Sequence, residues 1–312
     1  MFALQVSRDG RLLAFLHDSA RCPAAVRVVD VAVGSTRIIT ASEPAAAAET
    51  GFVTPALIRY TTHDGQRIPA YLYRPTGTGP FPVVLSIHGG PESQERPIYA
   101  YSGLYQYLCS HGVGVLAPNV RGSTGYGSAY QKLIHHDFGG AELGDFEHAV
   151  GYLHGLDWVD PDRSGVFGGS YGGFAALSCV SRLPDLWTGA VSIVGPSNLV
   201  TFARSVPPTW RRQMASWVGD PETEEEFLRS RSPLTYADRI RTPLFVIQGA
   251  QDPRVAQAES DQIVTSLRSR GVPVRYDVYP DEGHGFTKRR NELRALADAA
   301  DFLISQLTRT AP

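Results

Sequence analysis

The chain has 312 residues, of which 43% are hydrophobic and 19% charged, and its formal net charge is −2. This composition is typical of a globular protein with a large core, and the near-neutral charge excludes a basic nucleic-acid surface or an acidic solvating tail. No apolar run reaches the roughly 20 residues of a membrane helix, and Arg8 and Asp9 interrupt the N-terminus before a signal peptide forms. With three scattered cysteines, Cys22, Cys109 and Cys179, the sequence predicts a cytoplasmic protein with reduced thiols.

The first 40 residues are predicted to form an antiparallel β-meander. Their strand patterns are RLLAFLHDS, AAVRVVDVA and STRIIT, separated by turn dipeptides such as Asp9-Gly10. The alanine-rich stretch ASEPAAAAETGF that follows contains a proline and is typical of a linker. We therefore expect a β-meander with its linker over residues 1–49 and a second domain over residues 50–312.

From about residue 52, short apolar strand patterns alternate with helical patterns. The strand patterns are RIPAYLYRP, FPVVLSIHGG, VGVLAPNV, SGVFGGS, GAVSIVGP, PLFVIQGAQD and VRYDVYPDEGH. The helical patterns are YSGLYQYLCSHG, ELGDFEHAVGYLHGL, YGGFAALSCVSRL, QAESDQIVTSLRSRG and ELRALADAADFLISQL. This alternation, with strands apolar on both faces, predicts an α/β fold with a mostly parallel, doubly wound sheet. In such sheets ligands bind beyond the carboxyl ends of the strands.

The stretch Gly168-Gly169-Ser170-Tyr171-Gly172 fits the motif G-x-S-x-G between a strand and a helix. A reversal this tight needs glycines, because a Cβ would clash, and it holds the serine hydroxyl exposed in a strained conformation. The N–H of Tyr171 is left at a helix N-terminus, where it can face an oxyanion. We therefore predict Ser170 as a nucleophile; a Gly-rich phosphate loop or a plain tight turn is the alternative.

A serine nucleophile needs an adjacent base, and in α/β-hydrolases the chain order is Ser, then Asp or Glu, then His. Asp252 ends the apolar strand of VIQGAQDPR, and His284 lies in the glycine-flanked loop of YPDEGHGF. Both fall at the carboxyl edge of the sheet, so we expect His284 to transfer the serine proton and Asp252 to orient the imidazole. Asp281 and Glu282 lie too close to His284 in sequence to be obvious orienters, and remain the lesser alternatives.

A second oxyanion donor is expected after the early strand VVLSI, in the HGG-type motif His88-Gly89-Gly90-Pro91. Glycine lets a backbone N–H approach the substrate closely. Gly90 is the favoured donor and Gly89 the next candidate. We expect His88 to position the loop and not to act as a base.

The motifs HGGP, PNVRGSTGYG, GGSYGGF, DPRV and DEGHGF occur in this order, and together they resemble the prolyl oligopeptidase family of serine peptidases over about residues 52–310. SIVGPSNLVTF followed by SPLTYADRIRTPL resembles the acylaminoacyl-peptidase and dipeptidyl-peptidase-like bacterial branch. The resemblance implies an α/β-hydrolase fold that uses neither metal nor cofactor. It also implies the triad Ser170, Asp252 and His284, and an oxyanion hole from Tyr171 and Gly90.

A substrate pocket also follows from this resemblance. Arg254, two residues after the triad aspartate, would bind a substrate carbonyl with its fixed donors, and an ordinary surface arginine is the alternative. Val255 would line the pocket for the residue before the scissile bond. Trp210 and Val194 are weaker candidates, for which core or lid packing is an equal alternative.

The N-terminal region departs from the family pattern, in which a β-propeller precedes the hydrolase domain and gates the site. Here only about 40 residues precede the linker, and VSRDGRLLAFLHDSARCPAAVRVVDVA resembles the last propeller blade. One blade cannot close a propeller, so we expect a truncated product or a natural short form with a more open site. Free strand edges also predict self-association into a homodimer.

The sequence thus predicts a serine hydrolase that cleaves peptides or N-acylated peptides through an acyl-enzyme. A carboxylesterase of broad specificity is the alternative, because the same groups cleave esters more easily; a non-catalytic binding protein with a hydrolase fold is a lesser one. We expect no nucleic-acid or membrane partner. The adjacent histidines His135 and His136 predict no metal site, because they cannot share one helical face.

Overall fold

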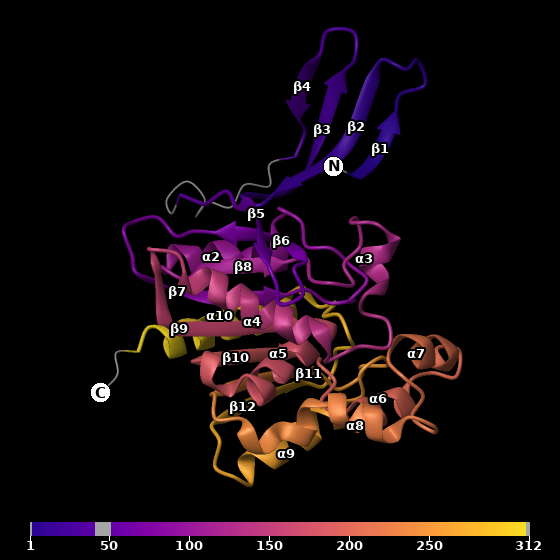
Figure 1. Cartoon of the computed structure of the whole chain (residues 1–312). Coiled ribbons are helices and arrows are strands. Elements are labelled where there is room, and N and C mark those ends of the chain that lie inside the picture. Colours follow the sequence, from indigo (N-terminus) through magenta and orange to yellow (C-terminus); the bar gives the residue numbers. More distant parts are fainter. Residues whose placement is uncertain (1, 41–50, 310–312) are drawn as a thin grey trace.

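The computed structural model describes residues 2–40 and 51–309, which form a small N-terminal sheet and a larger layered α/β part (Figure 1). The small sheet is an antiparallel meander of β1 (Phe2–Val6), β2 (Leu12–Ser19), β3 (Cys22–Asp30) and β4 (Ser35–Ile38). The sequence patterns identified β2 to β4 but not β1, whose five residues are all exposed and carry no burial pattern. Most of the predicted linker, and the predicted boundary at residues 49 and 50, lie outside the described residues.

The large sheet has eight strands. In spatial order they are β12 (Val274–Tyr279), β11 (Leu244–Gly249), β10 (Gly189–Ile193), β9 (Val159–Gly169), β7 (Phe81–Ile87), β8 (Gly114–Pro118), β6 (Arg67–Tyr73) and β5 (Ala56–Thr61). Strand β6 pairs antiparallel with β5 and β8, and every other pair in this sheet is parallel. The predicted mostly parallel sheet is confirmed.

The helical segments connect these strands and continue to the C-terminus. In chain order they are η1 (Ala100–Gly103), α2 (Leu104–Ser110), α3 (Ser128–Lys132), α4 (Ala141–His154), α5 (Tyr171–Arg182), η2 (Pro184–Leu186), α6 (Leu199–Ser205), α7 (Arg211–Trp217), α8 (Glu225–Arg231), η3 (Pro233–Arg239), α9 (Gln257–Arg268) and α10 (Arg289–Leu307). Within the described part of the chain, none of the helices is long and apolar enough to span a bilayer.

Helices cover both faces of the large sheet, because its central strands are apolar on both sides. On β11, Leu244 and Val246 join one core with side chains of α4, α5 and α9. Phe245 and Ile247 point the other way and join a second core with α2 and α10. We call these two sides the α5 face and the α10 face. Alternate strand residues pointing to two cores are the signature of a doubly wound sheet.

The carboxyl ends of the parallel strands bring distant loops to one edge of the large sheet. Ile87 on β7 is in register with Gly168 on β9, and Gly249 on β11 is in register with Tyr279 on β12. The loops that follow these strands carry the HGG motif, Ser170, Asp252 and His284. Parallel pairing therefore gathers the predicted site residues from four separate loops.

Candidate active site

Ser170 lies in a sharp turn between β9 and α5, with φ 58° and ψ −120°. A positive φ is rare for a residue with a side chain and costs about 1–3 kcal/mol, so the surrounding structure must hold it in place. A Cβ on Gly168 would lie 2.2 Å from the Gly172 carbonyl oxygen, and one on Gly172 would lie 2.0 Å from that of Ile87. The turn therefore requires glycine on both sides of Ser170.

The side chains of Ser170, His284 and Asp252 form one hydrogen-bonded chain. Ser170 Oγ lies 2.8 Å from His284 Nε2, and His284 Nδ1 lies 2.7 Å from Asp252 Oδ2. Because a carboxylate only accepts hydrogen bonds, Nδ1 carries the proton and Nε2 of the neutral ring accepts from the serine hydroxyl. This is the arrangement in which a histidine can take the serine proton.

Asp252 is held rigidly by its own loop. Its Oδ1 accepts hydrogen bonds from the backbone N–H groups of Arg254 at 2.8 Å and Val255 at 3.0 Å. Its side chain is 0% exposed, whereas that of His284 is 14% exposed. The other oxygen of this buried carboxylate is thereby directed at the imidazole, which fixes the tautomer of His284.

Asp281 and Glu282, the alternative orienters, bind elsewhere. Glu282 accepts from the backbone N–H of Thr287 at 2.9 Å and of Lys288 at 3.1 Å, and Asp281 pairs with the Lys288 ammonium. Both side chains hold the segment between β12 and α10. They position the loop that carries His284, and neither binds its ring.

Three backbone N–H groups are candidates for an oxyanion hole. Tyr171 is the first residue of α5, so no helical carbonyl accepts its N–H. Gly89 packs directly against Ser170, since a Cβ there would lie 3.1 Å from the Gly169 oxygen and 3.5 Å from Ser170 Cβ. Gly89 lines the cavity at Ser170 and Gly90 does not, although the sequence favoured Gly90.

His88 supports the glycine loop from behind. Its Nδ1 lies 2.7 Å from the Gly89 carbonyl oxygen and its Nε2 lies 2.9 Å from Ser123 Oγ. Burial lowers the pKa of His88, so the ring is held neutral. Because it bonds to the loop and to Ser123, and not to Ser170, it acts on the position of Gly89.

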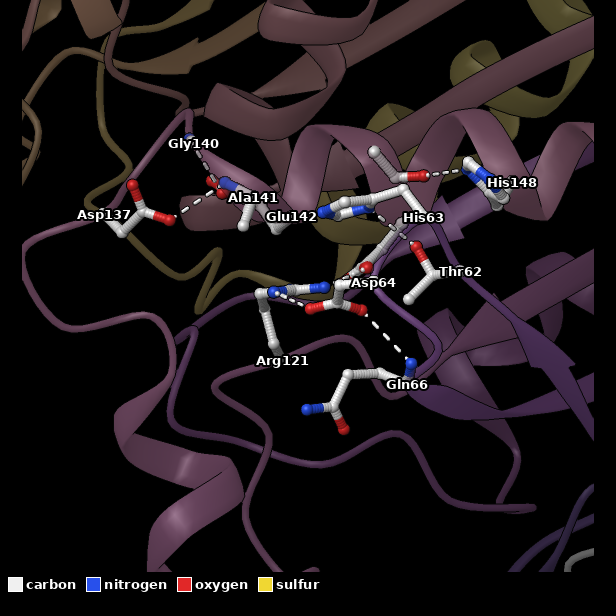
Figure 2. Close-up of polar contacts among 12 residues, drawn as sticks. Thr62, His63, Asp64, Gln66, Arg121, Asp137, Gly140, Ala141, Glu142 and His148 are labelled. Atoms are coloured by element: carbon white, nitrogen blue, oxygen red, sulfur yellow. Dashed lines mark hydrogen bonds and ion pairs between the residues drawn. The ribbon is translucent and has the colours of Figure 1, made fainter.

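A buried ion pair anchors the segment that carries Ser123. Arg121 donates to both carboxylate oxygens of Asp145 on α4, each at 2.7 Å, and Figure 2 shows its guanidinium beside Asp64, to which it also donates. The side chains of Arg121 and Asp145 are 5% and 0% exposed. Burial alone would lower the pKa of Arg121, but its bonds to these carboxylates raise it, so the guanidinium stays charged.

Glu142 supports the other side of the site, at the start of α4 (Figure 2). Its carboxylate accepts from the backbone N–H groups of Gly139 and Gly140 and from the Tyr171 hydroxyl, the last at 3.3 Å. Burial raises the pKa of Glu142 to about 7. The Tyr171 ring is thus held in place by α4.

A cavity of about 330 Å³ opens beside Ser170. Its walls are formed by Gly89, Tyr101, Gly169, Ser170, Ile193, Val194, His284, Gly285, Phe286, Glu292, Ala295 and Leu296. Of the four predicted pocket residues, Val194 is in this wall and Arg254, Val255 and Trp210 are not. The Arg254 guanidinium instead lies 5.6 Å from the centroid of the Trp210 ring. Val255 is buried, and its backbone N–H is bonded to Asp252.

The sequence patterns did not indicate the wall residues Tyr101, Phe286, Glu292 and Leu296. Phe286 belongs to the DEGHGF motif and could have been found there. The other three come from η1 and α10, where nothing in the local sequence separates a cavity residue from an ordinary helix residue. Among residues 2–40 and 51–309, no cluster of three His, Cys, Asp or Glu side chains has the arrangement of a metal site.

A tight turn carrying Ser170 at the end of a central parallel strand, followed in chain order by Asp252 and His284, places this molecule in the α/β-hydrolase fold class. The sequence profile of the prolyl oligopeptidase family matches residues 99–310. The chain therefore belongs to the prolyl oligopeptidase family of serine peptidases, and the predicted family is confirmed.

Individual relatives agree with this assignment. Dipeptidyl aminopeptidase BIII of Pseudoxanthomonas mexicana is 39% identical over 260 residues, covering 79% of this chain and 37% of that protein. A puromycin-hydrolyzing peptidase of Mycobacterium tuberculosis aligns with TM-score 0.85 and 28% identity over 96% of this chain and 46% of that one. The acylaminoacyl peptidase of Pyrococcus horikoshii shares the fold, with TM-score 0.88 and 22% identity over 100% of this chain and 50% of that one. The chain spans half the length of these proteins or less.

Proposed function

We propose that residues 50–312 form the catalytic domain of a serine peptidase that cleaves peptides or N-acylated peptides through an acyl-enzyme at Ser170. The observation that carries this proposal is the hydrogen-bonded chain from Ser170 Oγ through His284 to Asp252. The names of the relatives support it, since they describe a dipeptidyl aminopeptidase, an acylaminoacyl peptidase and a puromycin-hydrolyzing peptidase. All three names describe peptidases.

The proposed reaction begins when Ser170 Oγ attacks the substrate carbonyl carbon and its proton passes to His284 Nε2. The N–H of Tyr171, with that of Gly89 or Gly90, stabilises the negative charge that develops on the carbonyl oxygen. His284 then gives its proton to the leaving nitrogen, the C–N bond breaks, and the acyl group stays on Ser170. A water molecule repeats these steps and releases the acid, while Asp252 stabilises the imidazolium at both stages.

Arg254, Trp210 and Val255 remain our proposal for the acyl side of the substrate, whereas Val194 lines the cavity beside Ser170. Arg254 is exposed directly after the Asp252 loop, and its stacking on Trp210 holds the guanidinium in one region. A planar guanidinium held in this way can donate two hydrogen bonds to a substrate carbonyl. This supports a role in positioning the chain that precedes the scissile bond.

Replacement of Ser170 by alanine tests the proposal. We expect the Ser170→Ala variant to lose at least about a thousandfold in the hydrolysis of peptide anilides, because the oxyanion hole alone gives only a small part of the rate. Ser269→Ala, at an exposed serine after α9, is the matched control and should keep full activity. A fluorophosphonate probe should label the wild-type protein and not Ser170→Ala.

Two outcomes would overturn parts of this proposal. Substantial hydrolysis by Ser170→Ala would exclude the mechanism, and failure of the probe to label the folded wild-type chain would favour a non-catalytic role. A panel of peptide anilides, N-acyl-peptides and p-nitrophenyl esters separates a peptidase from a carboxylesterase. Cleavage of the esters alone would support the esterase.

We also propose that the chain forms a homodimer through its N-terminal sheet. Phe2, Leu4 and Val6 of the edge strand β1 are 48%, 55% and 60% exposed, and an exposed apolar edge strand is prone to pairing. Light scattering should show a dimer at micromolar concentration, and Leu4→Lys should shift it to the monomer. A monomeric wild type would exclude this proposal.

A further inference from the structure

The cavity beside Ser170 lies on the α10 face of the sheet. Ala295 belongs to the core of that face, and Tyr101, Phe286 and Leu296 pack against it. The proposed acyl-side residue Trp210 precedes α7, whose Met214 and Trp217 pack against the core of the α5 face. The two sets of residues therefore lie on opposite sides of the Ser170–His284 pair.

This division indicates which part of a substrate enters the cavity. His284 gives its proton to the leaving nitrogen, so the leaving group must lie on the side of the imidazole. The residues that follow His284, Gly285 and Phe286, continue directly into the cavity wall. The cavity is thus placed to receive the side chain of the first residue after the scissile bond, called P1′ below.

Apart from the reacting pair Ser170 and His284 and the hydroxyl of Tyr101, the wall of this cavity is apolar except for one carboxylate. Glu292 lies in the first turn of α10 and is half-buried, and its Oε1 accepts a hydrogen bond from Ser102 Oγ at 2.8 Å. Tyr101 and Ser102 both have positive φ, at 47° and 51°, so the loop presents this hydroxyl in a strained conformation. Because Ser102 holds one carboxylate oxygen of Glu292, the orientation of the other oxygen is restricted as well.

Glu292 has no cationic partner within residues 2–40 and 51–309. The nearby Lys288 pairs with Asp281, and Arg289 and Arg290 are exposed and lie outside the cavity wall. A carboxylate has about four acceptor positions, and Ser102 uses one of them. The others remain open to a donor that enters the cavity.

We propose that Glu292 makes this cavity a subsite for a lysine or arginine at P1′. The alkyl stem of such a side chain would lie along Tyr101, Phe286 and Leu296, and its charged end would pair with Glu292, as long basic side chains do elsewhere. The inference rests on the proposed function, because it takes Ser170 as the nucleophile. Beyond the proposed function, the inference specifies which side chain the site prefers in the first residue of the leaving peptide.

The test uses internally quenched peptides that differ only at P1′, with lysine, its uncharged analogue norleucine, or glutamate. In the wild-type chain, kcat/KM should be higher for lysine than for norleucine by about tenfold, the scale of a charge-assisted hydrogen bond at a partly exposed site. Glu292→Gln should bring the lysine-to-norleucine ratio close to one. Glu292→Lys should reverse the order, so that glutamate is preferred.

Asp298→Asn is the matched control. It removes one negative charge from the same helix at a residue that is paired with Arg275 and lies outside the cavity wall. This variant should keep the wild-type ratio, which separates local pairing at Glu292 from the general field of α10. A second series varied at P1 should show no dependence of its lysine-to-norleucine ratio on Glu292.

An unchanged P1′ ratio in Glu292→Gln would overturn the proposal and leave Glu292 as a favourable acid at a helix N-terminus. A lysine preference at P1 that depends on Glu292 would overturn the assignment to the leaving group. If the chain cleaves only esters, lysinamide and norleucinamide are compared as nucleophiles that attack the acyl-enzyme, form an amide and release Ser170. Failure of the proposed function differs from all these results, because the wild type would then not react with a fluorophosphonate.

Discussion

The two sheets of this molecule differ in how completely they are covered. Within residues 2–40, only Phe15, Ala20 and Ala25 are buried, and every residue of β1 and β4 is exposed. In the large sheet, every residue of β8 and β11 is buried. A sheet covered on both faces can hold loops in strained positions, whereas an open meander has little packing with which to do so.

The candidate site depends on that difference. Ser170 keeps a positive φ because β9, β7 and α5 surround it, and Asp252 keeps its direction because two backbone N–H groups bind it. The small sheet is joined to the large part by contacts such as the bond from Gln106 Nε2 to the Ala20 carbonyl at 2.7 Å. Equivalent substitutions in the two sheets should therefore have very different effects.

The largest contrast is expected for alanine at two glycines. In Gly172→Ala, the new Cβ would lie 2.0 Å from the Ile87 oxygen, so β7 and α5 must separate and we expect the fold to be lost. Gly10→Ala adds a Cβ with nothing within 4 Å at φ +71°, and should cost about 1 kcal/mol. Urea unfolding followed by circular dichroism measures both. Similar midpoints for the two variants would contradict the comparison.

The next contrast concerns two ion pairs. Arg121→Met leaves the buried Asp145 carboxylate without its partner, and should lower the free energy of unfolding by about 3–5 kcal/mol. Arg11→Met breaks the pair with Asp30 on the open sheet, where the Arg11 side chain is 62% exposed, and should change stability very little. The double variant Arg121→Met/Asp145→Leu should recover much of the loss in urea unfolding. No recovery would mean that the effect of Arg121 does not come from an unpaired charge.

A smaller contrast is expected in the dependence of stability on pH. Burial raises the pKa of Glu95 from 4.5 to about 7, so between these values the folded state binds more protons than the unfolded state. The stabilising contribution of this group is fully present below pH 4.5 and is lost as the pH rises through 7. At about 1.4 kcal/mol for each unit of the pKa difference, the total loss is about 3.5 kcal/mol. Glu95→Gln should remove this fall in the free energy of unfolding.

Asp9 on the small sheet should show the opposite sign. The Ser7 hydroxyl, followed by the backbone N–H of Arg11, lowers the pKa of Asp9 below 3.8. Its stabilising contribution is therefore present above pH 3.8 and is lost as the pH falls. Unfolding curves of Glu95→Gln, Asp9→Asn and the wild type from pH 2 to 8 check both signs. A wild-type slope that Glu95→Gln does not change would exclude the role given to burial.

Local patterns in the sequence predicted most of the fold. Apolar runs on both faces of strands such as β8 and β11 predicted a covered parallel sheet, and the order of Ser170, Asp252 and His284 predicted one shared edge. These predictions succeed because they depend on short stretches of sequence. The periodicity of a strand or helix, and the glycines of a tight turn, can each be recognised within a few neighbouring residues. Strand β1 was not predicted from the sequence, because its residues are all exposed and show no burial pattern.

The sequence by itself therefore determined the class of fold, the family and the residue types of the candidate site. Only the tertiary structure decided that Gly89 packs against Ser170, and that a hydroxyl and a carboxylate 190 residues apart, Ser102 and Glu292, meet at the cavity. The physical reason is that a cavity wall is assembled from side chains of separate elements. Which residues form the cavity wall depends on how η1 and α10 pack on the sheet, and this packing cannot be predicted from a local sequence pattern.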